Sequence, residues 1–331
     1  MSTIWTSLPT GAVASAAVLV ALGIDRCWGE PATRWHPVVW MGAYLTWAGQ
    51  RVAPLAHAPG GNERRVFWRG AMAWLAGALM VLVLSGALLW LLGNAPWWLQ
   101  PLVLGLLLKP MLAWRMLRDE VGAVEAALGI SLPAGRERLS WLVSRDVAEL
   151  DASQVRESAI ETLAENLNDS VVAPLFWFAM AGLPGAAVYR FANTADAMWG
   201  YRGERQGRDW TWAGKWAARA DDVLSWAPAR ITAALLMAWG TAVSWKALVV
   251  QARHTPSPNS GWPMAAMALV LGVQLSKPGV YALNEQGRHP QAYDIARAIR
   301  VGGRVAGSLA LAAVAVMLVS LLISLAGRVA W

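Results

Sequence analysis

Residues 70–93 are almost entirely apolar and carry no charged side chain. A helix of about 20 such residues is long enough to cross the hydrocarbon core of a membrane. Further long apolar runs occupy residues 8–24, 98–114, 231–251 and 305–326. Only 15% of the chain is charged, against about 25% in soluble domains. The sequence therefore predicts an all-α, polytopic membrane helix bundle, with about five to seven spans and helical cytoplasmic insertions.

Two other apolar segments are not expected to cross the membrane as simple helices. Residues 38–50 are too short to span about 30 Å and should be interfacial or re-entrant. Residues 170–189 are interrupted at Pro174 and Pro184, and broken hydrophobic segments often line cavities. We therefore expect residues 170–189 to be re-entrant or deeply packed, which keeps the polar segments before and after them on one side of the membrane.

The polar segments define the expected cytoplasmic side. Basic residues border the cytoplasmic ends of spans, and the first of them, Arg26, follows the apolar run 8–24, so the N-terminus is expected outside. Residues 115–169 form the largest polar insert and predict a helical cytoplasmic subdomain, with residues 190–230 as a cytoplasmic active-site segment. No repeat or low-complexity linker divides the chain, so residues 1–331 are expected to form a single integral-membrane domain.

Composition excludes several other classes of protein. The net charge is +7, but the basic residues are not collected in one patch with aromatic residues between them, so no nucleic-acid partner is expected. Cys27 is the single cysteine, which excludes a disulfide within the chain. No HExxH motif, paired CxxC motif or P-loop occurs. The chemistry is therefore sought among the carboxylates, amides and basic side chains of the polar segments.

Acidic residues recur every four positions from Glu157 through Glu161 and Glu165 to Asp169. On a helix they occupy an arc of roughly 120°, and no lysine or arginine lies on that face. Like charges at this spacing cost a few tenths of a kcal/mol per pair unless a cation lies against them. Either arginines from neighbouring segments neutralise this face, or Mg²⁺, which prefers oxygen ligands, does so beside a substrate. The density of acids, amides and cations in residues 190–230 favours Mg²⁺.

Such a surface suits a phosphate-bearing substrate, because Mg²⁺ bridges phosphate oxygens and arginine or lysine neutralises their charge. An adjacent pair of aspartates such as Asp221-Asp222 is also a common helix cap, and each basic residue could equally be a topology anchor or an ion-pair partner. The candidate metal ligands are Glu161, Glu165, Asp169, Asp221 and Asp222. The candidate phosphate-binding residues are Arg145, Arg190, Arg202, Lys215 and Arg230, and Asn193 and Asn259 are candidates for hydrogen bonds to substrate amides or for holding turns.

One histidine stands in an unusual loop near the N-terminus. His36 lies in a segment that Pro31 and Pro37 make rigid, and the same segment carries Glu30 and Arg34. A single histidine is more often a satisfied structural residue than a functional one. The acids and the arginine beside it keep a functional role open.

Short sequence blocks in collinear order over about residues 25–275 point to one family. These blocks are Asp25, Gly29-Glu30-Pro31, His36-Pro37-Val38, Ser144-Arg145-Asp146, Glu161-Thr162-Leu163-Ala164-Glu165-Asn166, Asp169, Pro184-Gly185-Ala186, Tyr189-Arg190, Asn193-Thr194, Asp196-Ala197-Met198, Gly200-Tyr201, Asp221-Asp222, Pro228-Ala229-Arg230 and Ser257-Pro258-Asn259-Ser260-Gly261-Trp262. In them the chain resembles the adenosylcobinamide-phosphate synthase family of cobamide biosynthesis (CobD/CbiB), whose relatives include AmpE-like membrane proteins.

The resemblance implies a multi-pass enzyme of the bacterial inner membrane with its active site facing the cytoplasm. It implies that ATP and Mg²⁺ drive amide formation between adenosylcobyric acid and (R)-1-aminopropan-2-ol O-phosphate. Membrane lipid is a further implied partner, together with a second copy of the chain or other enzymes of the corrinoid pathway. The implied catalytic residues are Asp146, His36 and Asn166. The implied substrate- and phosphate-binding residues are Arg145, Arg190, Asn193, Thr194, Arg202, Lys215, Arg230 and Asn259, and the implied metal ligands are Glu161, Glu165, Asp169, Asp196, Asp221 and Asp222.

The chain departs from the family pattern at three places. Met264 stands where an acidic residue is common, Ser225 stands where an asparagine often follows the aspartate pair, and Ser276-Lys277-Pro278-Gly279 replaces a glycine-rich ending. These departures concern the C-terminal third of the expected site. The main alternative function is an AmpE-like, non-enzymatic membrane sensor or scaffold. A transporter is least favoured, because transporters carry ionisable residues within their spans.

Overall fold

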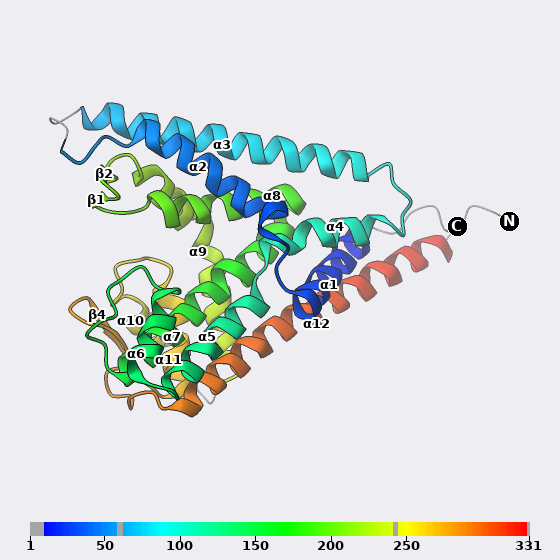
Figure 1. Ribbon diagram of the computed structural model, residues 1–331. Coiled ribbons are helices and arrows are strands. Elements are labelled where there is room, and N and C mark those ends of the chain that lie inside the picture. The colour runs from blue at the N-terminus through cyan, green and yellow to red at the C-terminus, as the bar shows by residue number, and fades with distance from the viewer. Residues whose placement is uncertain (1–9, 58–61, 241–243, 330–331) are drawn as a thin grey trace. The chain divides into compact units, whose positions relative to one another are not determined.

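The computed structural model describes residues 10–57, 62–240 and 244–329 (Figure 1). Most of this part of the chain is helical, and its strands are confined to two antiparallel hairpins of two strands each. The predicted all-α class is therefore confirmed. The expected position of the N-terminus outside the membrane concerns residues 1–9, which lie outside the described residues, as do residues 241–243 of the expected span 231–251.

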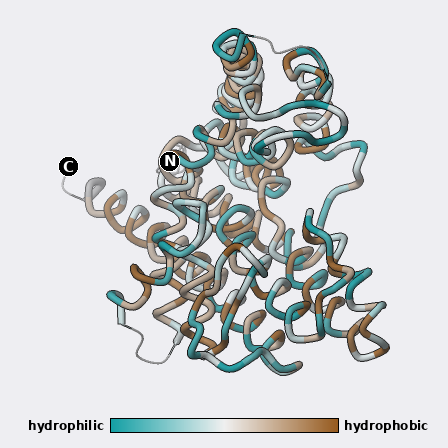
Figure 2. Tube along the Cα trace, turned by 90° about the vertical axis from the view of Figure 1, so that its left-hand side faces the viewer, coloured by the Kyte–Doolittle hydropathy of each residue, from teal (hydrophilic) through white to brown (hydrophobic). Residues whose placement is uncertain are grey.

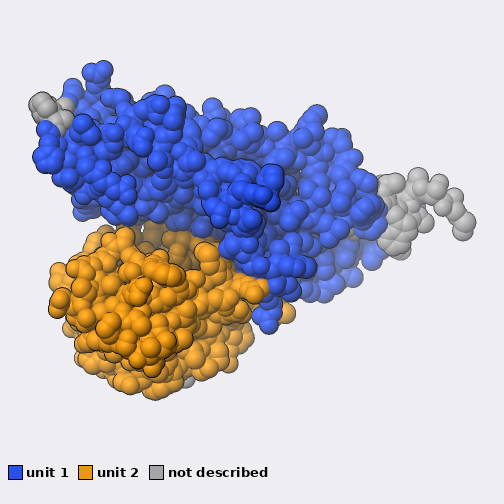
Figure 3. Space-filling model, viewed as in Figure 1, with its two compact units in different colours: residues 1–112, 173–224, 312–331 blue, residues 113–172, 225–311 orange. Residues whose placement is uncertain are grey.

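The chain divides into two compact units, each made of segments distant in sequence (Figure 3). Unit 1 consists of Met1–Leu112, Ala173–Leu224 and Ala312–Trp331, and unit 2 of Ala113–Val172 and Ser225–Leu311. Residues 115–169 are largely helical, and they belong with residues 225–311 to unit 2. Residues 190–230 are divided between the two units.

Unit 1 is built from long helices. α3 packs against α2 and α8, and α1 packs against α4. Its elements are α1 (Thr10–Trp28), η1 (Thr33–Trp35), α2 (Pro37–Val52), α3 (Glu63–Leu92), α4 (Gln100–Leu108), η2 (Lys109–Met111), α8 (Ala173–Trp199), β1 (Glu204–Arg205), β2 (Arg208–Asp209), the first part of α9 (Lys215–Ala238) and the end of α12 (Ala292–Val329).

Unit 2 is built around α7, which packs against α5, α6, α11 and β3. The capping box that Asp151 and Gln154 form at the start of α7 satisfies backbone groups that have no partner inside the helix. The elements of unit 2 are α5 (Trp114–Leu128), α6 (Leu132–Ser140), α7 (Ala152–Leu167), η3 (Asn168–Val172), α10 (Trp245–Ala252), α11 (Gly261–Leu271), β3 (Leu275–Lys277), β4 (Tyr281–Leu283) and the remaining parts of α9 and α12.

Among the described residues, four helical stretches are long and apolar enough to cross a membrane. α3 leaves many large apolar side chains exposed, including Leu79, Val83 and Leu84, as expected for a helix that faces lipid. Hydrophobic residues likewise dominate the helix that leads to the C-terminus (Figure 2). The four stretches are Gly11–Trp28, Glu63–Leu92, Ala152–Trp199 and Ala292–Ala326.

Two of the expected spans do not form single long helices, and shorter apolar helices occur in addition to the four long stretches. The apolar run 98–114 contains α4, which has nine residues and is followed by the 3₁₀ turn η2 at Pro110. Proline lacks the backbone N–H that continues an α-helix. The run 231–251 is divided between α9, which ends at Ala238, and α10, whose N-terminal flanking residue is Ser244.

The predicted interruption of residues 170–189 is confirmed. η3 is a π-helical turn, and within α8 the backbone leaves the helical region at Ala181 and at Gly182, where φ is +63°. Pro184 suits a break just before it, because proline donates no backbone hydrogen bond and its ring clashes with the carbonyl four residues earlier in a continuous helix. Glycine adopts a positive φ without steric cost. The re-entrant path of this segment stays a prediction.

Candidate functional site

Helix α7 is buried on both of its faces. Val155, Ile160 and Leu163 form the apolar face and are fully buried. Glu157 and Glu161 on the acidic face are also buried, with 1% and 4% of their surface exposed. Buried carboxylates require charged or hydrogen-bonding partners, so the surroundings of this face determine what it can do.

Arg145 is the cation that faces Glu161. Its Nη2 donates a hydrogen bond to Ser158 Oγ and lies 3.1 Å from Glu161 Oε2. Of the two arrangements considered for the acidic face, neutralisation by an arginine is therefore present at Glu161. Within the described part of the chain, two buried atoms of this pair, Arg145 Nε and Glu161 Oε1, have no hydrogen-bond partner.

A polar cavity of about 190 Å³ opens beside this ion pair in unit 2. Four of the predicted site residues line it, namely Arg145, Glu161, Glu165 and Asn166. Lys277 and Tyr281 were not among the predicted site residues, although they also line the cavity. The remaining lining residues are Leu142, Val143, Ser144, Thr162 and Met264.

The hydroxyl of Tyr281 stays protonated in this cavity. Burial raises the pKa of Tyr281, and the negative charges of Glu161 and Glu165 raise it further. The hydroxyl oxygen lies 3.8 Å from Met264 Sδ. Met264 and Lys277 both lie in the wall of the cavity. Both stand at positions where the chain departs from the family pattern.

Asp169 does not line this cavity, contrary to the expectation of one continuous acidic face. Asn168 Nδ2 donates to Asp169 Oδ1 at 2.8 Å, and Thr232 Oγ1 donates to Asn168 Oδ1 at 3.0 Å. The reason lies in η3, where the wider π-helical turn adds a residue to the turn. Residues after Leu167 therefore leave the four-residue register of α7.

Two of the predicted catalytic residues in unit 2 are engaged in local hydrogen bonds. The exposed Asp146 accepts a hydrogen bond at Oδ1 from the backbone N–H of Ala148, at 2.9 Å. Asn166 Nδ2 donates to the backbone carbonyl of Thr162 at 3.0 Å. Asn166 lies in the cavity wall, whereas Asp146 follows Arg145 in the loop beside it.

The structure brings Arg230 and Asn259 together in unit 2. Arg230 Nη1 donates to Asn259 Oδ1 at 3.0 Å. The guanidinium also lies over the rings of Trp226 and Trp262, 4.4 and 4.6 Å from their centroids. Burial lowers the pKa of Arg230. Neither Arg230 nor Asn259 lines the 190 Å³ cavity.

A second polar group lies in unit 1, between α8 and the start of α9. Asn193 accepts from Arg190 Nη1 at 3.5 Å and donates to Asp221 Oδ1 at 3.4 Å. Thr194 Oγ1 donates to the backbone carbonyl of Arg190 at 2.7 Å. Asp196 lies about one turn further along α8. Its carboxylate occupies the space that a Cβ at position 200 would need, and Gly200 leaves that space open for it.

Three other predicted residues of unit 1, Arg202, Lys215 and Asp222, also interact with neighbouring side chains. Burial raises the pKa of Asp222, and the charge of Arg202 partly offsets this effect. Lys215 Nζ lies over the ring of Trp212, 3.7 Å from its centroid. Asp222 is therefore electrostatically coupled to Arg202, and Lys215 makes a cation–π contact.

His36 in unit 1 is held in a structural arrangement. Its Nδ1 accepts a hydrogen bond from Val38 N at 3.3 Å and so caps α2. The hydrogen therefore belongs on Nε2, which lies 3.0 Å from Glu30 Oε2. Because Nδ1 is already an acceptor and Nε2 a donor, this geometry disfavours His36 as a proton acceptor in catalysis.

The same loop encloses a buried lysine. Lys109 is 2% exposed and lies 3.1 Å from Asp25 Oδ1 and 2.7 Å from Glu30 Oε1. Lys109 is therefore enclosed in an ion-pair network. Burial raises the pKa of Glu30, yet hydrogen bonds from His36 and Lys109 outweigh this effect and leave it below the ordinary value.

Unit 1 also contains a large apolar cavity of about 700 Å³. Helices α2, α3, α4 and α8 contribute to its lining, which includes Trp35, Trp40, Leu88, Leu106 and Phe191. Trp35 and Trp40 are more than half exposed. Exposed tryptophans of this kind are typical of the membrane interface.

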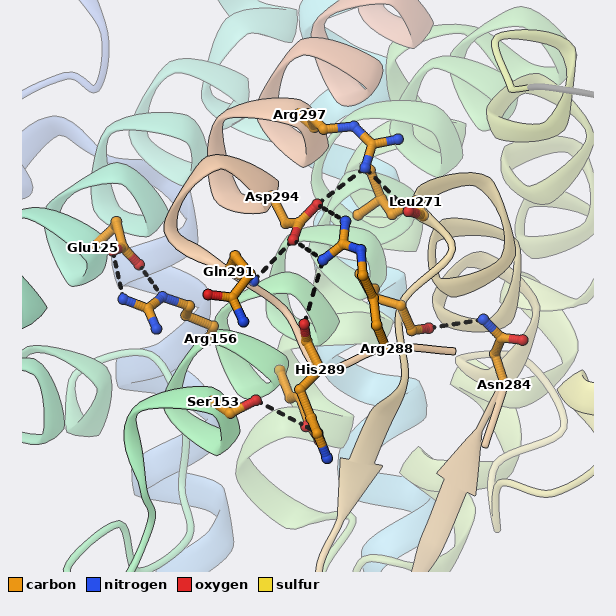
Figure 4. Close-up of polar contacts among 12 residues, drawn as sticks. Glu125, Ser153, Arg156, Leu271, Asn284, Arg288, His289, Gln291, Asp294 and Arg297 are labelled. Atoms are coloured by element: carbon orange, nitrogen blue, oxygen red, sulfur yellow. Dashed lines mark hydrogen bonds and ion pairs between the residues drawn. The ribbon is translucent and has the colours of Figure 1, made fainter. Parts of the chain in front are cut away.

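Other charged residues of unit 2 serve to hold its helices together (Figure 4). Arg156 on α7 forms two hydrogen bonds to Glu125 on α5. The fully buried Asp294 pairs with Arg288 and Arg297. The nearby Glu157 accepts a hydrogen bond from Ser276 and lies 3.2 Å from Nδ1 of the exposed His289. Glu157 therefore has structural partners, which leaves Glu161 and Glu165 as the acids of α7 that line the cavity.

The candidate carboxylates belong to two units. Glu165 lies in unit 2 and Asp222 in unit 1, so their convergence on one divalent ion stays a prediction. In residues 10–57, 62–240 and 244–329, no group of three or more His, Cys, Asp or Glu side chains is arranged to hold a metal ion.

These features define a helical membrane protein with a charged cavity, and comparison with known proteins places it in a family. The model of the CobD/Cbib protein family matches residues 18–302, so the chain belongs to this family. A probable cobalamin biosynthesis protein CobD of Methanothermobacter thermautotrophicus is 39% identical over 82% of this chain and 86% of its own length. No match to a solved structure was found.

Two bacterial relatives show similar agreement. The cobalamin biosynthesis protein CobD of Rhodobacter capsulatus is 38% identical over 90% of this chain and 95% of its own length. That of Chromobacterium violaceum is 40% identical over 86% of this chain and 91% of its own length. The matches therefore cover nearly the whole of each relative.

Proposed function

We propose that this chain acts in cobalamin biosynthesis as an adenosylcobinamide-phosphate synthase. The reaction joins a carboxyl group of adenosylcobyric acid to the amine of (R)-1-aminopropan-2-ol O-phosphate, with ATP and Mg²⁺. Family membership supports the pathway, because the relatives are named cobalamin biosynthesis proteins. The observation that carries the reaction is the cavity in unit 2, where two cations, two carboxylates and a tyrosine hydroxyl surround a small space.

The proposed reaction has two steps. A carboxylate oxygen of the corrinoid attacks the terminal phosphorus of ATP, which forms an acyl phosphate and releases ADP. The amine nitrogen of the second substrate then attacks the acyl carbon, inorganic phosphate leaves with the bonding electrons, and the amine proton passes to a base. Negative charge on phosphate oxygens is present throughout, so the protein contributes mainly positioning and positive charge.

The residues of the cavity fit a divalent cation that is shared with a substrate. Glu161 Oε1 is buried and has no hydrogen-bond partner among the described residues, and Glu165 lines the same space. Mg²⁺ is typically held by one or two carboxylates, while water and substrate phosphates complete its coordination. Such a cation would neutralise phosphate oxygens during transfer. Asp196, Asp221 and Asp222 in unit 1 are the second set of candidate ligands.

The other candidate residues have proposed roles that agree with their contacts. Arg145 would bind a phosphate group through Nε, the nitrogen that lacks a partner among the described residues. Asp146 is the preferred proton acceptor for the amine, because its carboxylate is exposed and Oδ1 accepts only a local backbone hydrogen bond from Ala148. The apolar cavity of unit 1, with Trp35 and Trp40, is the candidate contact for the corrinoid.

The test is product formation by the purified protein in detergent. With both substrates, ATP and Mg²⁺, we expect adenosylcobinamide phosphate, ADP and inorganic phosphate in equal amounts, and no product when ATP or Mg²⁺ is omitted. Glu161→Gln should lower the rate by about 100-fold, because it removes a carboxylate from the cavity. Glu149→Gln, at an exposed position in the same unit, is the matched control and should retain the parent rate.

Absence of product from folded parent protein would contradict the proposal. The AmpE-like sensor or scaffold would then be favoured if changes at Glu161 and Glu165 also left nucleotide affinity unaltered. Nucleotide affinity is measured in the same detergent preparation, so both functions are compared on one sample.

A further inference from the structure

The β3–β4 hairpin carries two residues of the cavity wall. Leu275 pairs with Leu283, and Lys277 pairs with Tyr281. Directly opposed residues in an antiparallel ladder point to the same face, and alternate residues along each strand share that face. Leu275 and Leu283 are fully buried, so this face is turned into unit 2. The register therefore brings Lys277 and Tyr281 to the cavity.

The hairpin is also fixed in place by its turn and by α7. Gly279 in the turn has a φ of +72°, a conformation that glycine adopts without steric cost. Ser276, between the two inward-facing residues of β3, donates a hydrogen bond to Glu157 on α7. Lys277 is therefore attached to a constrained backbone.

Lys277 has no carboxylate partner in the part of the chain that the structure describes. Its ammonium group makes no ion pair or hydrogen bond there, although it is partly buried and lines a cavity that also contains Glu161 and Glu165. The other cation of the cavity, Arg145, pairs with Glu161 through Nη2, while its buried Nε has no hydrogen-bond partner. The wall of the cavity thus contains one ammonium group and one guanidinium group.

We propose that Lys277 is a phosphate-binding residue, and that Lys277 and Arg145 together hold a phosphate monoester in this cavity. The proposal rests on the proposed function. Lysine and arginine are the usual side chains for phosphate, because their hydrogen bonds to it are charge-assisted. The resemblance to the family did not identify Lys277, which lies in a block that departs from the family pattern.

The size and charge of the cavity restrict the ligand. A volume of about 190 Å³ is below the 300–1,000 Å³ that is typical for drug-sized ligands. It suits a small phosphate ester or the terminal phosphate of a nucleotide. Glu161 and Glu165 would repel a bare anion, so the ligand should bring a cation with it. Aminopropanol phosphate carries an ammonium group and ATP carries Mg²⁺, so both sources of phosphate meet this requirement.

The experiment measures KM separately for aminopropanol phosphate and for ATP in the full-length protein. Lys277→Met removes the charge and keeps most of the side-chain length, so it should raise one KM by at least about tenfold. The substrate whose KM rises is the one whose phosphate group Lys277 binds. Lys277→Arg should recover most of the affinity. Lys246→Met, at an exposed lysine outside the cavity wall, should leave both KM values unchanged.

Unchanged KM values for both substrates in folded Lys277→Met, including a loss confined to kcat, would overturn the proposal. If the parent makes no amide product, the proposed function fails and the dissociation constants of aminopropanol phosphate and Mg²⁺-ATP decide instead. A tenfold weaker binding of either ligand by Lys277→Met would support phosphate binding at Lys277, and equal binding would overturn it. The melting temperature of each variant in detergent establishes that it is folded.

Discussion

Arg145 Nη2 lies 3.1 Å from Glu161 Oε2 and forms an ion pair at the wall of the cavity in unit 2. The pair neutralises an acidic residue that is 4% exposed, and it leaves one donor and one acceptor without partners among the described residues. It therefore has two consequences. We expect it to stabilise the fold of unit 2, and we propose that it takes part in binding a ligand.

The first prediction concerns stability. Arg145→Ala should destabilise the protein by about 3 kcal/mol, because removal of one partner leaves a buried carboxylate without its cation. The measurement is the free energy of unfolding in detergent. Arg118→Ala, which breaks an exposed pair with Asp119, should cost less than about 1 kcal/mol. Equal effects of the two changes would show that the Arg145–Glu161 pair does not stabilise unit 2.

The second prediction concerns the buried lysine of unit 1. Lys109→Met should destabilise by about 3–5 kcal/mol, because Asp25 and Glu30 lose the cation between them. Adding Asp25→Asn to this variant should recover part of the loss, since one uncompensated charge is then removed. Lys246→Met at an exposed site provides the control for the change in side chain. If the double variant is no more stable than Lys109→Met, the ion-pair network is not the cause.

The third prediction concerns pH. The pKa of Glu30 in the folded protein is below its ordinary value of 4.5. Ionised Glu30 therefore contributes stability above about pH 4.5, and this contribution is lost as the pH falls through the lowered pKa. Between about pH 6 and about pH 3.5, the melting temperature of the parent should fall further than that of Glu30→Gln. Glu149→Gln should follow the parent, and identical curves for all three proteins would contradict the assignment.

Features that depend on local sequence could be predicted from the sequence. The four-residue spacing of acids indicated α7, and the prolines of residues 170–189 indicated the break that occurs at Ala181 and Gly182. Hydrophobic runs identified α3 and the later part of α12 as membrane helices. Each of these follows from periodicity or from the backbone restriction that proline imposes.

Features that depend on tertiary contacts could not be predicted in this way. The π-helical turn moves Asp169 away from the helix face that carries Glu161 and Glu165. No residue type in η3 predicts such a turn. Lys277 reaches the cavity only through its strand register with Tyr281. Histidine is a common catalytic base, yet the ring of His36 caps α2 and contacts Glu30. The division of the chain into two units also depends on packing between segments far apart in sequence.

The most direct test of the central claim measures whether metal, phosphate and Glu161 meet in one site. Mn²⁺ substitutes for Mg²⁺, and the ³¹P resonance of bound aminopropanol phosphate or of the terminal phosphate of ATP reports paramagnetic broadening. The account predicts strong broadening in the parent and in Glu149→Gln, and its loss in Glu161→Gln when ligand is still bound. Equal broadening in Glu161→Gln and the parent would contradict a metal and phosphate site at the cavity of unit 2.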